Sequence, residues 1–196
     1  MKTKSLLFSL LIVIVLFNDS FSQDKSKAFT VPKVVWFGVD FTAAKFTLVD
    51  DNPAIIVNQY LKTINTLILT QPEKFDIKKF FNKAEVFNNI DQAVEYNLKI
   101  DPSSLVITGN YSLDPDEVKN IIKKYNVKEN SGTGLIFIAE SLDKVAQTGS
   151  YYVCFFDIAS KKIIDSRRMV GKASGFGFRN YWSGTIYNIM KMWALQ

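Results

Sequence analysis

The sequence predicts an α/β (α+β) fold: a single-domain mixed sheet of four to six strands with helices packed on it, including a long C-terminal helix. The run Tyr151–Phe156 is apolar on both alternating faces, as in a strand covered on both sides, and we expect it to be the central strand. From near Asn180, large apolar residues recur every three or four positions, forming one helical stripe: Trp182, Ile186, Ile189 and Trp193. A strand followed by a helix nearer the N-terminus completes the layered pattern.

The beginning of the chain predicts an exported protein. Lys2 and Lys4 precede the apolar stretch Leu6–Phe17, which is shorter than the roughly 20 residues a membrane-spanning helix needs. Ser20-Phe21-Ser22 fits a signal-peptidase site and would leave Gln23 as the mature N-terminus. An uncleaved membrane anchor is the alternative. We expect a periplasmic or secreted protein that is not lipidated, because no cysteine lies near this site.

The predicted organisation is a signal peptide at 1–22, a flexible leader at 23–30 and a single α/β domain at 31–196. Val34–Val39 predicts the first strand, and Phe41–Asp50 a loop. Asn52 can cap a helix whose first turn holds Pro53, and the apolar repeat continues to about Leu69.

The segment from Gln71 to Asn110 has a weaker pattern. It predicts short helices and strands at these ranges: 74–81 (helix), 85–87 (strand), 91–97 (helix) and 105–107 (edge strand). Asp114-Pro115-Asp116-Glu117 is a clear helix start, and we expect that helix to reach Tyr125. A turn cluster at Asn130–Gly134 follows. The remaining strands are expected at 135–139, 151–158 and 163–169, with a turn at 159–162 and a tight return at Gly149.

Composition excludes several kinds of chemistry. The chain has no histidine and one cysteine, so Ser-His-Asp catalysis, a His-based zinc site and an intramolecular disulfide are excluded, and we expect no cofactor. Cys154 is expected to be a buried apolar residue; a catalytic nucleophile is the alternative. The net charge is +5, and removing residues 1–22 takes away two positive charges and one negative charge, leaving +4. Because the charges are interspersed, we expect a solvated surface and no nucleic-acid partner.

A glycine-rich loop precedes the last helix, with Gly171, Gly175 and Gly177. It suggests a phosphate loop, but a P-loop would need glycine at Ser166 and a dinucleotide site would need glycine at Asn180. We therefore expect no nucleotide, and glycines that permit a sharp strand-to-helix reversal with positive φ.

Three acidic residues, Asp40, Glu140 and Asp157, lie at or just beyond the ends of apolar strands. A shared sheet edge could bring them together in the way that glycosidases arrange two carboxylates. The alternative is that they are ordinary solvated residues.

The last helix is apolar around most of its circumference. Outside its buried stripe, a second face carries the residues we expect to contact a partner: Arg179, Tyr181, Tyr187, Met190 and Met192. The alternative is that the segment from Gln71 to Asn110 folds over this face.

The residues G-K-A-S-G-F-G-F-R-N-Y-W and the preceding Y-Y-V-C-F-F-D-I-A-S-K-K-I-I resemble a family of exported envelope proteins of Gram-negative bacteria, as does W-F-G-V-D-F-T in the first strand. The order of elements is distantly similar to the small α/β domain of the TolB N-terminal region, the curli secretion lipoprotein and lipoprotein activators of peptidoglycan synthases. The resemblance implies a non-enzymatic assembly or partner-binding role. It carries over no catalytic residue, and this chain lacks the lipidated cysteine of those lipoproteins.

These observations together predict an exported non-enzymatic binding or assembly module of the bacterial cell envelope. Its partner would be an envelope protein, with peripheral contact to membrane or peptidoglycan also open. The alternative is a carboxylate-dependent hydrolase acting on an envelope polymer.

Overall fold

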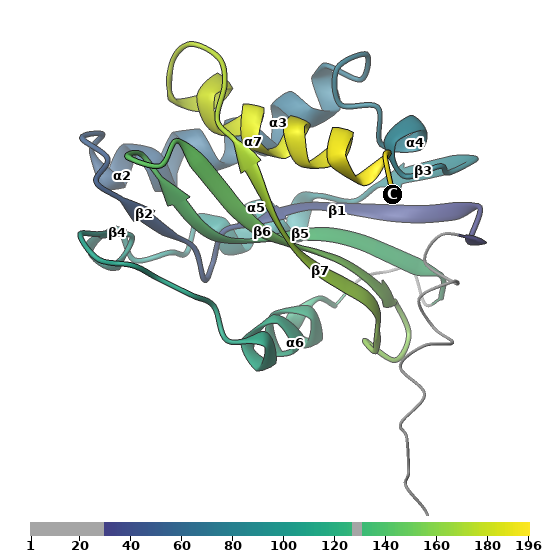
Figure 1. Ribbon diagram of the computed structural model, residues 1–196. Helices are drawn as coiled ribbons and strands as arrows, with labels where there is room; N and C mark the ends of the chain where they lie inside the picture. The colour runs from purple at the N-terminus through teal and green to yellow at the C-terminus, as the bar shows by residue number, and fades with distance from the viewer. Residues whose placement is uncertain (1–29, 127–130) are drawn as a thin grey trace, which may run out of the picture.

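The computed structural model describes residues 30–126 and 131–196, which form one α/β domain around a seven-stranded sheet (Figure 1). The strands are β1 (Lys33–Asp40), β2 (Lys45–Thr47), β3 (Glu85–Asn88), β4 (Val106–Ile107), β5 (Thr133–Asp143), β6 (Thr148–Asp157) and β7 (Ile163–Lys172). The predicted signal peptide, residues 23–29 of the predicted leader and Asn130 of the predicted turn cluster lie outside the described residues.

Helices separate β2 from β3, β3 from β4 and β4 from β5, whereas β5, β6 and β7 follow one another directly. The helices are α2 (Pro53–Ile55), a π-helical turn (Ile56–Tyr60), α3 (Leu61–Thr70), α4 (Ile77–Phe80), α5 (Asp91–Asn97), a short 3-10 turn (Pro102–Ser104), α6 (Pro115–Lys124) and α7 (Phe178–Trp193). Both predicted capping signals are confirmed. The side chain of Asn52 accepts a hydrogen bond from Ala54 N–H at 2.9 Å, and that of Asp114 accepts one from Asp116 N–H at 2.8 Å.

β5 holds the central place in the sheet. β1 pairs in parallel with its first half and β2 in parallel with its second half, while β6 pairs antiparallel along its other side. β3 extends the sheet from β1, β4 extends it from β2, and β7 is added to β6. The sheet is therefore mixed, as predicted, but Tyr151–Phe156 in β6 is an internal strand beside the central one.

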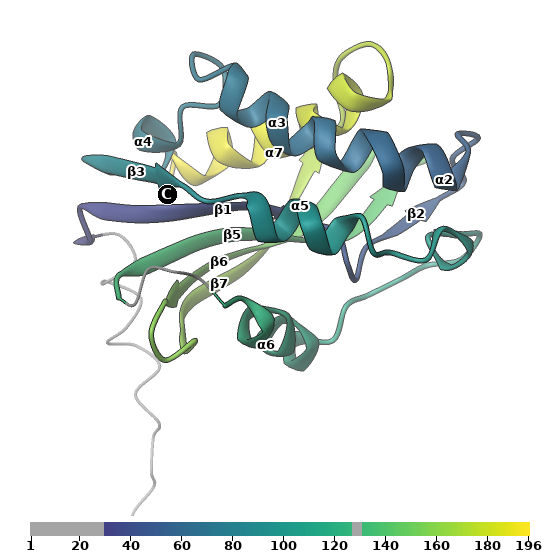
Figure 2. The ribbon, with the colours of Figure 1, turned by 180° about the vertical axis from the view of Figure 1, so that it is seen from behind.

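Helices cover both faces of the sheet. α3 and α7 lie side by side on one face and α6 lies on the other, as the two opposite views show (Figures 1 and 2). Side chains alternate accordingly: Trp36, Phe137 and Phe155 pack in the α3–α7 core, whereas Phe37 and Cys154 pack in the α6 core. The continuous apolar runs of the inner strands follow from this double coverage.

The sheet has seven strands where four to six are predicted, and two further details of the predicted strands are wrong. The expected loop Phe41–Asp50 contains β2, which extends the line of β1 along β5 after a short break. Gly149 lies inside β6, opposite Leu142, and the hairpin turn comes before it. A Cβ at Gly149 would come within 2.9 Å of the Thr185 hydroxyl, so this glycine serves close packing of α7 on the sheet.

Candidate functional site

The predicted partner face of the last helix is largely covered. Met190 is fully buried, and the ring of Tyr187 packs edge-on against Phe75 and Phe80, with centroid distances of 6.0 and 5.9 Å. The prediction that Met190 belongs to an accessible face is therefore wrong. The reason is the alternative considered from the sequence: the segment containing α4 folds over this part of α7.

The start and the end of α7 remain accessible. Arg179 and Met192 are exposed, and Tyr181 is half-buried. The ammonium group of Lys144, from the hairpin between β5 and β6, lies 4.3 Å from the centroid of the Tyr181 ring. Only the N-terminal part of the predicted face, near Arg179 and Tyr181, adjoins the glycine-rich loop.

This loop presents an aromatic side chain to solvent. Phe176 is 95% exposed, and it stands between Gly175 with a φ of 112° and Gly177 with a φ of 76°. Both values lie in the region that glycine adopts without strain, so the predicted reversal with positive φ is confirmed at these two positions. The loop is tied to α7, because Asn180 Nδ2 donates to the Phe176 carbonyl at 3.1 Å and Ser174 N–H donates to the Tyr181 carbonyl at 3.2 Å.

Gly171 has a different role from the one predicted. It lies in β7 and is not among the residues with positive φ. A Cβ at this position would come within 2.1 Å of the Thr185 carbonyl oxygen, so Gly171 permits close contact between α7 and β7. The loop glycines and the strand glycine thus serve separate purposes.

Two hollows flank Phe176. One, of about 260 Å³, is lined in part by Asp51 and Lys144, and the other, of about 370 Å³, in part by Tyr60 and Arg179. Phe178 lines both hollows, and its ring stacks on Tyr60 at a centroid distance of 4.5 Å and on buried Phe46 at 5.7 Å. We call Phe176 with these two hollows the Phe176 surface.

The predicted carboxylate cluster does not form. In the pairing of β5 with β6, Asp157 lies opposite Thr133 at the start of β5, whereas Glu140 lies near the other end of that strand. Asp157 accepts hydrogen bonds from the main chain and hydroxyl of Ser160, which lower the pKa of its carboxyl group. It therefore stabilises the turn after β6.

Glu140 is fully buried and already engaged. Its carboxylate accepts hydrogen bonds from Leu113 N–H at 3.0 Å, from the Ser112 hydroxyl at 3.3 Å and from Arg168 Nε at 2.7 Å. This carboxylate joins β5, β7 and the segment before α6.

Asp40 is the buried acid at the carboxyl end of β1, and it is 1% exposed. Its Oδ1 accepts bonds from the Thr42 N–H at 2.8 Å and hydroxyl at 2.6 Å, and its Oδ2 accepts one from the Tyr125 hydroxyl at 2.7 Å. Burial and the neighbouring carboxylate raise the pKa of Tyr125 well above its usual value. All three donors are neutral, and no cationic group of the described residues pairs with Asp40 as a salt bridge.

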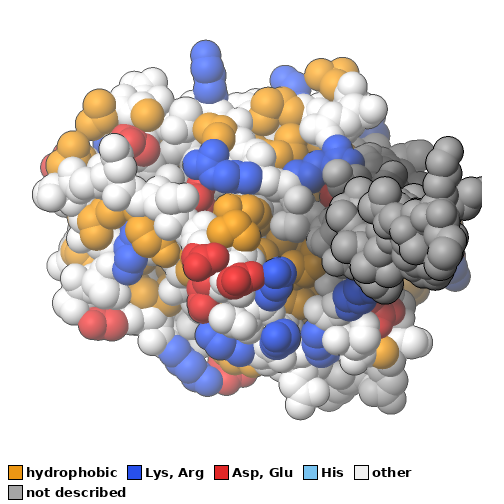
Figure 3. All heavy atoms as spheres, turned by 60° about the horizontal axis from the view of Figure 1, so that its bottom comes forward, with side chains coloured by type: hydrophobic (Ala, Val, Ile, Leu, Met, Phe, Trp, Pro, Cys, Tyr) orange, Lys and Arg blue, Asp and Glu red, His pale blue; other side chains and the backbone are white. Residues whose placement is uncertain are grey.

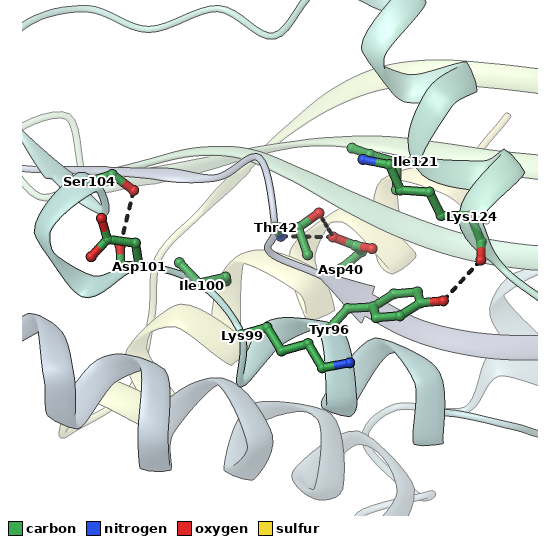
Figure 4. Close-up of a pocket in the computed structure, with 9 residues that line it drawn as sticks. All are labelled: Asp40, Thr42, Tyr96, Lys99, Ile100, Asp101, Ser104, Ile121 and Lys124. Atoms are coloured by element: carbon green, nitrogen blue, oxygen red, sulfur yellow. Dashed lines mark hydrogen bonds between the residues drawn. The ribbon is translucent and has the colours of Figure 1, made fainter.

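A cavity of about 470 Å³ opens beside Asp40 (Figure 4). It lies between α5 and α6. β1 pairs in parallel with β3 on one side and with β5 on the other, so the order of the strands reverses at this point of the sheet. Open α/β sheets commonly bind ligands at the carboxyl ends of strands at such a reversal. We call this space the Asp40 cavity; periodicity and composition gave no sign of it, because its walls come from three separate parts of the chain.

The face on the α6 side carries Lys and Arg side chains interspersed with Asp and Glu, as the space-filling view shows (Figure 3). Within residues 30–126 and 131–196, no three His, Cys, Asp or Glu side chains gather as they would around a metal ion. Of the helices in the described part of the chain, none has the length and apolar character needed to cross a membrane.

Comparison with protein-family models, with curated proteins and with solved structures found no match for this chain.

Proposed function

We propose that this protein is an exported, non-enzymatic binding or assembly module of the bacterial cell envelope, which holds a protein partner at the Phe176 surface. The observation that carries the proposal is the 95% exposure of Phe176 between two glycines with positive φ. A phenylalanine ring left in water gives up the roughly 1.5 to 3 kcal/mol that its burial would contribute, so a partner that encloses it gains that free energy.

The loop is organised before any partner arrives. The hydrogen bonds from Asn180 and Ser174 fix its main chain against the start of α7. Phe178, which begins α7 directly after the loop, is itself held by stacking on Tyr60. Holding an aromatic anchor in a fixed position reduces the conformational entropy lost on binding. Such aromatic anchors, surrounded by near-neutral contacts, dominate the energetics of many protein interfaces.

The charges around Phe176 favour a protein over a lipid surface. Asp51 and Lys144 line one hollow and Arg179 lines the other, so both signs are present. An anionic membrane surface attracts clusters of Lys and Arg, whereas a polar rim of mixed charge around an apolar centre is typical of protein interfaces.

The hydrolase alternative has weaker support. Cleavage by a carboxylate pair needs two acids within reach of one substrate bond. The strand register keeps Asp157 away from Glu140, and Asp40 alone of the three predicted acids lines the Asp40 cavity. Every oxygen of Asp40 and Glu140 also accepts at least one hydrogen bond within the protein.

The envelope location is supported by the N-terminal sequence, with its positive residues, short apolar core and Ser20-Phe21-Ser22 site. Intact-mass measurement of the protein isolated from its native host tests this part. We expect a mature chain that begins at Gln23. Recovery of a chain that still carries Met1 would contradict cleavage and favour an uncleaved anchor.

The binding role is tested by comparing wild type with Phe176→Ser, using Leu195→Ser as the matched control. Leu195 is 87% exposed but lies at the C-terminus, away from the glycine loop. After cross-linking and purification from envelope fractions, wild type and Leu195→Ser should recover the same partner, and Phe176→Ser should lose it while keeping the wild-type melting temperature. Equal recovery by all three proteins would contradict the proposal.

A further inference from the structure

We propose that the Asp40 cavity binds a small zwitterion of the α-amino-acid type, with its ammonium group directed to Asp40, its carboxylate at the lysines of the rim and an apolar side chain between them. This site lies on the α6 face of the sheet, while the Phe176 surface belongs to the opposite, α7 face. The inference is therefore independent of the proposed partner binding.

The cavity has the size and lining of a small-molecule site. Its volume of about 470 Å³ lies within the range of roughly 300 to 1,000 Å³ that is usual for ligand pockets. The ring of Tyr96 and the aliphatic side chains of Ile100 and Ile121 form apolar walls. Tyr96 is held in place by a hydrogen bond from its hydroxyl to the Lys124 carbonyl at 2.9 Å, so this wall is fixed before a ligand enters.

The deep end of the cavity suits a cationic donor. A carboxylate offers about four acceptor positions, and the Asp40 carboxylate accepts two bonds at Oδ1 and one at Oδ2. One acceptor position on Oδ2 is therefore unused by the described residues, and because Asp40 is only 1% exposed, a ligand must displace lining side chains to reach it. The three existing donors are neutral, so the buried negative charge is solvated by hydrogen bonds without a protein cation to compensate it, and an ammonium group would supply that cation.

The rim suits an anionic group. Lys99, two residues after α5, and Lys124, the last residue of α6, line the cavity from its two sides (Figure 4). Lys99 is 2.6 Å from Glu95, and Lys124 is 3.8 Å from Glu117. An ammonium group has three N–H donors, so each lysine can still donate to a ligand carboxylate after its existing contact.

The overall charge of the lining favours a net-neutral ligand. Asp40 and Asp101 provide two negative charges, and Lys99 and Lys124 provide two positive charges. A simple amine would be attracted to Asp40 but repelled by the lysines at the entrance. A simple carboxylate would be attracted to the lysines but repelled by Asp40. A zwitterion places each of its charges beside the opposite one.

The experiment measures binding to the mature chain by isothermal titration calorimetry and by ¹⁵N chemical-shift perturbation. The probes are L-leucine, 3-methylbutylamine, which lacks its carboxylate, and 4-methylpentanoate, which lacks its ammonium group. We expect saturable binding of L-leucine, with shifts at Tyr96, Ile100 and Ile121, and affinities at least about tenfold lower for each of the other two probes. If leucine does not bind, the remaining standard amino acids are titrated in the same way.

Two variants locate the site. Lys124→Met should weaken amino-acid binding about tenfold or more, whereas the matched control Lys119→Met, on α6 but outside the cavity lining, should bind as wild type does. Asp40→Asn should abolish binding; if this variant does not fold, Lys99→Met replaces it and should behave as Lys124→Met does. The absence of saturable binding by every amino acid, equal binding of the amine or the acid, or unchanged affinity in Lys124→Met would each overturn the proposal.

Discussion

Asn65 in α3 forms two hydrogen bonds with the main chain of Val39 in β1. The Val39 N–H donates to Asn65 Oδ1 at 2.7 Å, and Asn65 Nδ2 donates to the Val39 carbonyl at 3.0 Å. The pairing of β1 with β5 is interrupted between Trp36 and Val39, where Gly38 has a φ of 82°. Asn97 in α5 completes the arrangement, since its amide donates to the Val39 carbonyl and accepts from Phe41 N–H. These two buried amides hold the end of β1 that carries Asp40.

Replacing Asn65 with leucine should destabilise the protein markedly. Asn65→Leu keeps the side-chain shape but leaves the Val39 N–H buried without its acceptor, which costs roughly 1 to 3 kcal/mol. Urea unfolding gives the free energy of unfolding. Asn120→Leu, at an exposed position of α6, is the control and should change this free energy by less than about 0.5 kcal/mol. Equal stability of the two variants would mean that the Asn65 bonds do not support the end of β1.

The sequence could not distinguish Asn65 from a surface residue. Asparagines are common on exposed helix faces, and only the path of β1 beneath α3 shows that this one is buried. The same limit applies to Asp40 and Tyr125, which are 85 residues apart and joined by one hydrogen bond. Local signals were predicted well, because the caps at Asn52 and Asp114 depend on neighbouring residues alone.

The misassigned residues of the candidate site have related causes. Met190 is predicted to be accessible because α7 is apolar around its circumference, but it lies in the α3–α7 core. Its neighbour Tyr187 is covered by Phe75 and Phe80, which belong to the segment around α4, a helix of four residues with a weak sequence signal. β2 was missed because three residues are too few to show an alternating pattern. Phe176 was overlooked as an anchor because phenylalanine is usually buried, and its exposure depends on the conformation of the adjacent glycines.

The thiol of Cys154 should be inert in the folded protein. The residue is fully buried between β5 and β7, and burial raises the pKa of its thiol to about 12. We expect negligible reaction with a thiol reagent at about pH 8 until denaturant unfolds the chain, because the thiolate is the reactive form. Rapid labelling of the native protein would show that this part of β6 is accessible.

Substitutions at Cys154 test the same burial by a second route. Cys154→Ala removes only a small buried group and should cost a few kcal/mol or less, whereas Cys154→Asp would bury a charge without a partner and should prevent folding. Circular dichroism and urea unfolding measure both. A folded, soluble Cys154→Asp protein would contradict the position of this residue in the α6 core.

Tyr125 should make stability depend on pH in the alkaline range. Its folded-state pKa lies above its unfolded value of about 10, so the folded state holds the proton more tightly. Its contribution is fully present below about pH 10 and is lost as pH rises from there toward the folded-state pKa. Tyr125→Phe should be less stable at neutral pH, because Asp40 loses a donor, but should lose stability less steeply above about pH 10. Parallel curves for the two proteins would contradict this.

Arg168 should contribute more to stability than other exposed arginines. Its Nε donates to buried Glu140 at 2.7 Å, and removing it leaves a buried carboxylate with two neutral donors. We expect Arg168→Ala to cost about 2 to 3 kcal/mol in urea unfolding, and Arg179→Ala less than about 0.5 kcal/mol. Glu140→Gln should restore part of the stability of the Arg168→Ala protein. Similar costs for the two arginines would show that Glu140 does not depend on Arg168.

The central claim is that Phe176 contacts a protein partner. Its most direct test places a photo-cross-linking phenylalanine analogue at position 176 of the protein expressed in its native host, with the same analogue at position 195 as the control. Illumination should give one discrete covalent adduct with an envelope protein from position 176 and none from position 195. No adduct from position 176, or the same adducts from both positions, would contradict the account.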